Sequence, residues 1–201
     1  GRGGFAMAAA GRNVAARLLG RWRLPSRLPV ELYLTPDIVS SPPGGRCDAL
    51  VNPANERQVV DGLVHAFGGR EMKDNCQALP ERGPDGVRCP IGEAAVTPAC
   101  SDLRAWYGYV VHVAPPMYGD DGWAASLASC YRAALAAAST RQLQVVASPL
   151  ICAGARGAPV DEAAHVAIEA LAASPVAGVV RFGVRSAGVA EVLAAALERA
   201  A

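Results

Sequence analysis

The sequence predicts an α/β fold, a three-layer α/β/α sandwich that forms one main domain. Short apolar runs of strand length alternate along the chain with longer Ala-rich segments, in which larger apolar residues recur at helical spacing. The strand-like runs are apolar along their whole length, which is typical of a sheet with both faces covered by helices. The chain of 201 residues is long enough to bury one core of this kind.

Six strands are expected from the apolar runs. In chain order they are Val30–Leu34, Cys47–Val51, Ala94–Thr97, Tyr109–Val113, Gln144–Ala147 and Gly178–Phe182. Helices are expected between and after them, because apolar residues such as Leu127, Tyr131 and Leu135 recur on one helical face. The segments with this pattern are Gly62–Phe67, Asp120–Ser139, Asp161–Ala172 and Ala187–Ala200.

The N-terminal 27 residues are expected to form an extension, with the main domain at residues 28–201. The extension is rich in arginine and has no acidic residue before Glu31. Two interpretations stay open: an organelle transit peptide, or an amphipathic helix over Asn13–Trp22 that packs Val14, Leu18 and Leu19 on the domain. Residues 1–5, ahead of Met7, are interpreted as residues added to the natural chain.

Composition excludes several function classes. A net charge of +1 and a pI near 7.8 provide no general field for nucleic acids or acidic membranes. Six cysteines lack the spacing of a zinc site or a disulfide framework, so we expect reduced thiols and an intracellular location, cytoplasm or nucleus. No apolar stretch reaches the roughly 18 residues of a membrane span. His65 and His165 lack a second ligand at metal spacing, so no metal is expected.

The segment Asp48–Asn55 is the most informative motif, because a short apolar run ends in two asparagines. Amide side chains at the end of a strand can read sugar hydroxyls without charge. The alternative is an Asx-type turn. We interpret Asn52 as fixing the loop and Asn55 as the ligand residue.

A second motif, Ile151–Pro159, follows another apolar run and precedes a helix. Its small residues would let backbone N–H groups approach an anion, and the helix that begins near Asp161 would add its positive end. The alternative is a Gly-rich linker turn. In α/β folds, ligands bind beyond the carboxyl ends of the strands, where this loop and Asn55 would meet.

The order and spacing of the motifs resemble those of the macrodomain family, the ADP-ribose-binding modules, from about Val30 to Leu193. The resemblance implies a mixed sheet of about six strands. It also implies ADP-ribose as ligand or product, no separate cofactor, mono-ADP-ribosylated proteins as partners, and a monomer. The matching pieces are Thr35–Ile38, Asp48–Asn55, Val60–Gly62, Cys89–Ala94, Thr97, Val111–Pro115, Ser129–Tyr131 and Gly154–Pro159.

Residue roles follow from the resemblance. Asp37 would accept the adenine amino group and the N–H of Ile38 would meet the ring. The alternative role of Asp37 is to cap a helix, and the two roles are compatible. Asn55 would contact the distal ribose. Asp61 would orient or deprotonate a water at the anomeric carbon. Val60, which precedes it, would contact the substrate. The alternative role of Asp61 is that of a helix N-cap.

The second loop would hold the diphosphate and cover the ribose. Arg156 and Arg185 stand where many macrodomains carry aromatic residues, and a guanidinium can stack on adenine or pair with a diphosphate. Arg185 has a solvated arginine as its alternative. The residues that would contact substrate here are Cys152, Ala153, Gly154, Ala155, Arg156, Gly157 and Arg185.

One departure from the family pattern leaves two possible functions. Macrodomains usually place a run of glycines between the asparagine and the Val-Asp pair, whereas this chain has Glu56-Arg57-Gln58-Val59. The leading expectation is a hydrolase that removes mono-ADP-ribose from acidic side chains of proteins, or cleaves O-acyl-ADP-ribose. The alternative is a non-catalytic ADP-ribose reader, and a nucleic-acid module is disfavoured by charge. No lysine lies between Asn55 and Gly69, so covalent lysine catalysis is not expected.

Overall fold

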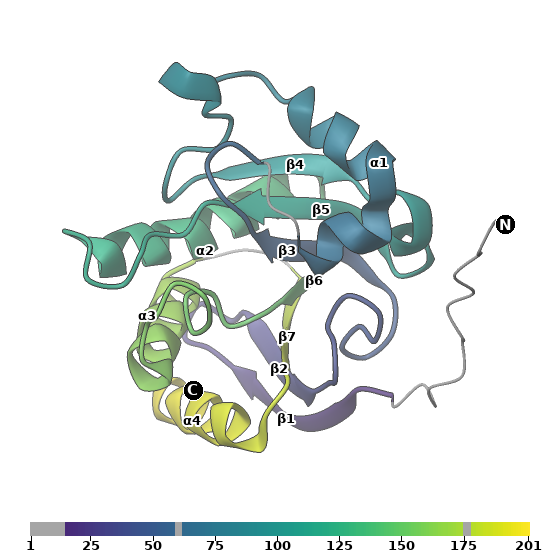
Figure 1. Cartoon of the computed structure of the whole chain (residues 1–201). Coiled ribbons are helices and arrows are strands. Elements are labelled where there is room, and N and C mark those ends of the chain that lie inside the picture. Colours follow the sequence, from purple (N-terminus) through teal and green to yellow (C-terminus); the bar gives the residue numbers. More distant parts are fainter. Residues whose placement is uncertain (1–14, 59–61, 175–177) are drawn as a thin grey trace, which may run out of the picture.

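The computed structural model of the chain describes residues 15–58, 62–174 and 178–201. These residues form a mixed seven-stranded sheet flanked by four helices, so the α/β class expected from the sequence is confirmed (Figure 1). No helix among the described residues is both long and apolar enough to span a membrane.

The elements follow the order expected from the apolar runs, with one strand added at the N-terminal end. The strands are β1 (Arg17–Arg23), β2 (Pro29–Leu34), β3 (Cys47–Pro53), β4 (Ala94–Pro98), β5 (Tyr107–Val113), β6 (Val145–Ser148) and β7 (Val179–Val184). The helices are α1 (Leu63–Gln77), α2 (Trp123–Thr140), α3 (Val160–Ala172) and α4 (Ala187–Ala200), with 3-10 turns η1 (Pro84–Gly86) and η2 (Ser101–Ala105).

The sheet has the strand order β1-β2-β7-β6-β3-β5-β4. The five inner strands run parallel, whereas β1 and β4 are antiparallel edges. The central neighbours β3 and β6 are far apart in sequence, and the Asp48 carboxylate joins them. Its Oδ2 accepts hydrogen bonds from the backbone N–H of Gln144 (2.7 Å) and Val145 (2.8 Å). Because the five inner strands are parallel, their carboxyl ends all lie at the same edge of the sheet.

The two faces of the sheet pack against different helices. On one face, Ala49 and Val51 of β3 join the core cluster that includes residues of α2, α3 and α4. On the other face, Leu50 joins a smaller cluster with α1 and η2. This alternation follows from the period of two along a strand and produces the three layers of the sandwich (Figure 1).

The N-terminal segment differs from the expected helix. Residues 17–23 form β1, which pairs antiparallel with β2 from Arg17 opposite Leu34 to Arg23 opposite Pro29. The predicted helix over Asn13–Trp22 is therefore wrong for the described residues. The physical reason is the edge of β2, whose backbone groups are satisfied by a partner strand. The sheet consequently begins before the domain boundary predicted at residue 28.

Helix α1 is longer than expected and bent. It continues past Phe67 to Gln77, although Gly69 within it has φ 60° and ψ −153°. A left-handed φ of this kind is accessible to glycine without a steric penalty, so the chain can bend there and resume the helix. Helix α1 and η2 pack together beside the β4 edge of the sheet.

A charged cluster covers the sheet where β1, β2 and β7 lie side by side. Glu31 accepts hydrogen bonds from Arg21 Nε (2.8 Å), Tyr33 Oη (2.9 Å) and Arg181 Nε (2.9 Å). Arg181 also donates to the carbonyl of Gly44 (3.2 Å), which fastens the loop after β2 over this face. Burial would raise the pKa of Glu31, but the hydrogen bonds from Arg21 and Tyr33 and the charge of Arg181 outweigh it and lower that pKa.

A second polar cluster, centred on the buried His112, joins α1 to three strands. The ring of His112 contacts Asn52 Nδ2 through Nδ1 (3.2 Å), and Thr97 Oγ1 (2.9 Å) and Cys76 Sγ (3.7 Å) through Nε2. The Thr97 hydroxyl can donate onward to the sulfur of Met72 (3.5 Å), which fits a neutral imidazole protonated at Nε2. Burial, with a smaller contribution from the charge of His65, lowers the pKa of His112 to about 3.

Replacing Glu31 by Gln tests the charged cluster. The change removes the charge that three donors share, with Arg181 half-buried, so the free energy of unfolding at pH 7 should fall by about 2 kcal/mol. Urea unfolding followed by circular dichroism measures it. The matched control is Asp74→Asn, which breaks the exposed Arg70–Asp74 pair and should cost less than about 0.5 kcal/mol. Equal losses in both variants would contradict a special role for Glu31.

The buried imidazole predicts a dependence of stability on pH. Because the folded-state pKa of His112 lies below the ordinary value of 6.5, the unfolded chain binds a proton first as the pH falls. Stability from this group is therefore complete above pH 6.5 and declines below it, by about 2 kcal/mol between pH 7 and pH 5. His112→Gln should lack that decline in urea unfolding at the two pH values, whereas the exposed-residue control His165→Gln should keep it.

Candidate ligand-binding site

The candidate site lies at the carboxyl ends of β3 and β6. The chain leaves β3 towards α1 on one face of the sheet, and it leaves β6 towards α3 on the opposite face (Figure 1). Adjacent parallel strands with diverging connections leave a crevice between their loops, and this is where open α/β sheets bind ligands. The loop that follows β6 is 149–159, and residues 54–58 are the described start of the loop that follows β3.

The described part of the loop after β3, residues 54–58, is held by several hydrogen bonds. Ala54 N–H donates to Val113 O (2.8 Å), which continues the strand pairing for one more residue. The carbonyl of Asn55 accepts from Gln58 N (3.1 Å) and Gln58 Nε2 (2.9 Å). Gln58 has φ 59°, so the turn closes in a conformation that is uncommon for non-glycine residues. The backbone around Asn55 is thereby fixed at the end of β3.

Asn52 has the structural role expected of it, through an unexpected partner. Its amide contacts His112 Nδ1 rather than backbone groups of the Pro53 turn. His112 is a buried core residue, and both of its ring nitrogens have hydrogen-bond partners. The buried cluster around His112 therefore anchors the strand end from which Asn55 projects.

The loop after β6 is shaped by two residues with positive φ, Cys152 (68°) and Gly157 (80°). Gly157 N donates to Gly154 O (2.9 Å), and Ala158 N donates to Cys152 O (3.1 Å). Burial raises the pKa of the Cys152 thiol to about 11, so this sulfur is protonated at neutral pH and serves as packing. A Cβ placed on Gly154 would meet nothing within 4 Å, which leaves open space above the loop.

Helix α3 follows this loop but does not present a purely positive end. It begins at Val160, and Asp161 and Glu162 lie in its first turn. The negative charges of those carboxylates partly neutralise the positive charge of the helix N-terminus. The contribution expected from the helix to anion binding is therefore reduced, and Arg156 is the nearest cation in the sequence of this loop.

Arg156 joins the two loops. Its Nη2 donates to the carbonyl of Ala54 (3.2 Å), and its Nη1 lies 3.3 Å from the sulfur of Met117. Its own carbonyl accepts from Tyr118 N (2.9 Å). The expectation that the Asn55 loop and the second loop meet at the strand ends is thus confirmed at this contact. A guanidinium has five N–H donors, so donors remain for an anionic ligand.

Asp37 closes the turn that follows β2. Its carboxylate accepts from Val39 N (2.9 Å), Ser40 N (3.2 Å) and Ser40 Oγ (2.6 Å). This is the capping role that stood as the alternative, realised in a turn and not at a helix. A carboxylate offers about four acceptor positions, so one further donor, such as an amino group of a ligand, can still be accommodated.

Ile38 and Arg185 lie at the ends of neighbouring strands β2 and β7. A Cβ on Gly183 would be 3.0 Å from Ile38 Cδ1, so the missing side chain lets Ile38 pack directly over β7. The carbonyl of Ile38 accepts from the Tyr107 hydroxyl. Arg185 follows β7 and is exposed, and Ser186 after it caps α4 by accepting from Val189 N (3.2 Å).

Two predicted site residues, Val60 and Asp61, lie outside the described residues. The N-cap position of α1 belongs to Gly62, which is the position that the capping interpretation gave to Asp61. Gln58, the last described residue before them, closes the turn that follows β3. Gly62, the first described residue after them, precedes the first residue of α1.

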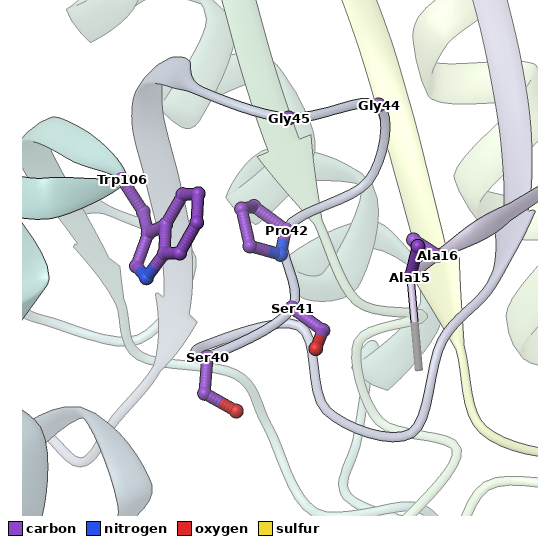
Figure 2. Close-up of a pocket in the computed structure, with 8 residues that line it drawn as sticks. All are labelled: Ala15, Ala16, Ser40, Ser41, Pro42, Gly44, Gly45 and Trp106. Carbon is purple, nitrogen blue, oxygen red and sulfur yellow. The ribbon is translucent and has the colours of Figure 1, made fainter. Parts of the chain in front are cut away.

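A separate cavity of about 320 Å³ lies beside the loop after β2. In Figure 2, the ring of Trp106 and Pro42 form facing walls, and the hydroxyl groups of Ser40 and Ser41 provide polar atoms. None of the predicted site residues lines it, and nothing in the sequence marked it. The lining residues are Ala15, Ala16, Ser40, Ser41, Pro42, Gly44, Gly45 and Trp106.

Sequence reasoning missed the turn that precedes α2. Met117 and Tyr118 reach Arg156 from this turn, and Tyr118 Oη donates to Glu162 Oε1 (2.9 Å). The available signal was two large apolar residues directly before Gly-Asp-Asp-Gly, a place where turns are normally polar.

Comparison with known proteins identifies relatives of the chain and of its fold. A macro domain-containing protein of Xanthomonas campestris is 37% identical over 127 residues, which cover 60% of this chain and 69% of that protein. One from Vibrio parahaemolyticus is 39% identical over 128 residues, covering 60% and 71%. Among solved structures, a mutant of the Oceanobacillus iheyensis macrodomain superposes with a TM-score of 0.79 at 21% identity, covering 94% of this chain and 96% of that one.

Two further structures of the Oceanobacillus macrodomain carry ligands. One is described as bound with ADP (TM-score 0.75, 22% identity, covering 92% and 96% of the chains). A mutant is described with ADPR (TM-score 0.76, 22% identity, covering 92% and 98%). The family model described as Macro domain matches residues 51–167, from the end of β3 to within α3. This match spans more than half of the sequence, and the chain belongs to the macrodomain family.

Proposed function

We propose that this protein binds ADP-ribose in the crevice between the loops after β3 and β6, and hydrolyses single ADP-ribose groups from modified proteins or from O-acyl-ADP-ribose. The observation that carries the proposal is the contact of Arg156 Nη2 with the carbonyl of Ala54 (3.2 Å). It brings the only charged side chain of residues 152–157 to the loop that bears Asn55. The family membership and the ADP and ADPR complexes of the structural neighbours support the choice of ligand.

The proposed binding mode distributes the ligand over four strand ends. Asp37 and the N–H of Ile38 hold the adenine, beside Arg185 at the end of β7. The diphosphate lies over the loop 152–157, where small residues expose backbone N–H groups and Arg156 supplies charge-assisted hydrogen bonds. The Asn55 amide holds hydroxyls of the distal ribose.

The proposed reaction is displacement at the anomeric carbon of that ribose. A water oxygen forms a new bond to the anomeric carbon while the bond to the ester oxygen of the protein carboxylate breaks, and the carboxylate leaves with the electron pair. Asp61 takes the proton from the water, and its charge favours an oxocarbenium-like transition state. Val60, which precedes Asp61 in the sequence, contributes a substrate contact in this proposal.

A reader function is the second candidate, and one observation favours it. The turn from Asn55 to Gln58 is closed by two hydrogen bonds and replaces the glycine-rich run of the family. Such a run provides backbone N–H groups that can approach a diphosphate and order a water. Without it, ligand contacts at Asp37, Asn55 and Arg156 would suffice for binding alone.

Calorimetric titration and a hydrolysis assay separate the two functions. ADP-ribose should bind, and a protein mono-ADP-ribosylated on glutamate should lose its label in the same preparation. Asp61→Ala should reduce the rate of release by at least about 100-fold, since a general base contributes roughly that much, with the affinity for ADP-ribose changed by less than about threefold. Binding without release in the unmodified protein would make it a reader.

Replacing Arg156 by Gln tests the loop contact. The loss of charge-assisted hydrogen bonds to the diphosphate should weaken ADP-ribose binding by about tenfold, measured by calorimetry. The exposed Arg132 on α2 provides a matched control, because Arg132→Gln removes the same charge from a residue outside both loops of the candidate site. Equal affinities for the two variants would remove Arg156 from the proposed site.

A further inference from the structure

The surface next to the crevice carries exposed apolar side chains. Met117 and Tyr118, in the turn before α2, are 45% and 40% exposed. Trp123 lies behind them, with its ring centroid 4.9 Å from that of Tyr118 at an interplanar angle of 68°. In Figure 1 the turn before α2 projects from the body of the molecule, so these side chains are accessible to a large partner. Grouped exposed apolar side chains mark interaction surfaces more often than isolated ones do.

The turn is held in place by hydrogen bonds to carboxylates. Asp120 Oδ2 accepts from Met117 N (3.0 Å), and Glu162 Oε1 accepts from Tyr118 Oη (2.9 Å). The hydrogen bond to Glu162, burial, and the charges of Glu162 and Asp161 raise the pKa of the Tyr118 phenol. The first turn of α3 thus lies against the turn before α2, and a partner would meet a surface that is already formed.

This surface is acidic as well as apolar. We call residues 117–123 together with Asp161 and Glu162 the acidic rim. It contains four carboxylates, all on exposed residues, and no lysine or arginine. Large apolar side chains beside a group of carboxylates are complementary to a polypeptide that combines aliphatic stems with positive charges, as lysine and arginine do.

The acidic rim is continuous with the candidate site. The guanidinium of Arg156 contacts Met117 Sδ (3.3 Å) on one side and Ala54 O (3.2 Å) on the other. A chain that emerges from the crevice on the side of Arg156 therefore passes directly over Met117 and Tyr118. The rim is thus placed to meet whatever is attached to the ligand held in the crevice.

We propose that the acidic rim docks the polypeptide that carries the ADP-ribosyl group and selects modified sites flanked by lysine or arginine. This inference rests on the proposed function, because it requires the ADP-ribosyl group to occupy the crevice. Exposed ion pairs contribute little individually, so two or three of them should give a preference of about tenfold. The preference should weaken as salt is added.

The test uses two peptides with one ADP-ribosyl group joined by a linkage that cannot be hydrolysed. The modified residue is flanked by lysines in one peptide and by glutamates in the other, and free ADP-ribose is titrated in parallel. The lysine peptide should bind about tenfold more tightly at low salt. Asp121→Asn with Asp161→Asn should abolish most of this difference. Any gain in affinity from removing the Asp161 charge at the start of α3 should be shared by free ADP-ribose and both peptides, so the ratio of the two peptide affinities is the readout. Glu191→Gln with Glu198→Gln on α4 is the control and should keep the difference.

The outcomes separate this inference from the proposed function. Binding of free ADP-ribose with equal affinities for the two peptides would overturn the docking surface and leave the ADP-ribose site standing. A preference for the lysine peptide that survives in the Asp121→Asn, Asp161→Asn variant would also overturn it, because the charge would act elsewhere. Failure to bind free ADP-ribose would overturn the proposed function, and the docking role with it.

Discussion

The pairing of β3 with β6 is the constraint on which the rest of the structure depends. These strands are neighbours in the sheet but distant in sequence, and Asp48 holds the start of β6 through hydrogen bonds to Gln144 N and Val145 N. Because the register is set at one end of the pair, the loops at the other end are brought together. The contact of Arg156 with Ala54 is a consequence of that register. The pairing of β3 with β6 therefore determines how the two loops of the candidate site are placed.

The fold was largely predictable because its inner strands are buried on both faces. Such strands read as continuous apolar runs, and the five inner strands, together with the edge strand β4, appear within a few residues of their expected bounds. The exception, β1, alternates exposed arginines with half-buried Leu19 and Trp22. That pattern fits an amphipathic helix as well as an edge strand, and only the unpaired edge of β2 decides between them. Whether residues 17–23 form a helix or a strand thus depends on a tertiary contact, which the local sequence does not reveal.

The candidate site shows the same division. The residues at strand ends, such as Asn55 and Asp37, could be located because polar residues directly after apolar runs are conspicuous. Their contacts could not be read from the sequence, since Asp37 binds within its own turn and Asn52 binds His112 of another strand. The contact of Arg156 with Met117 and Ala54 depends on three loops at once. Sequence thus indicates which residues stand at the crevice, and folding determines which of their donors and acceptors remain available.

The added strand β1 has a consequence for how the protein can be divided. A fragment that begins at Pro29 would keep every inner strand and the whole crevice, but it would lose Arg21 from Glu31 and leave the backbone of β2 without a partner on one side. An open, largely apolar edge of this kind is a template on which another chain can add a strand. Self-association and poor solubility of such a fragment would then originate at the edge of the sheet farthest from β4, and would say nothing about the integrity of the ligand site.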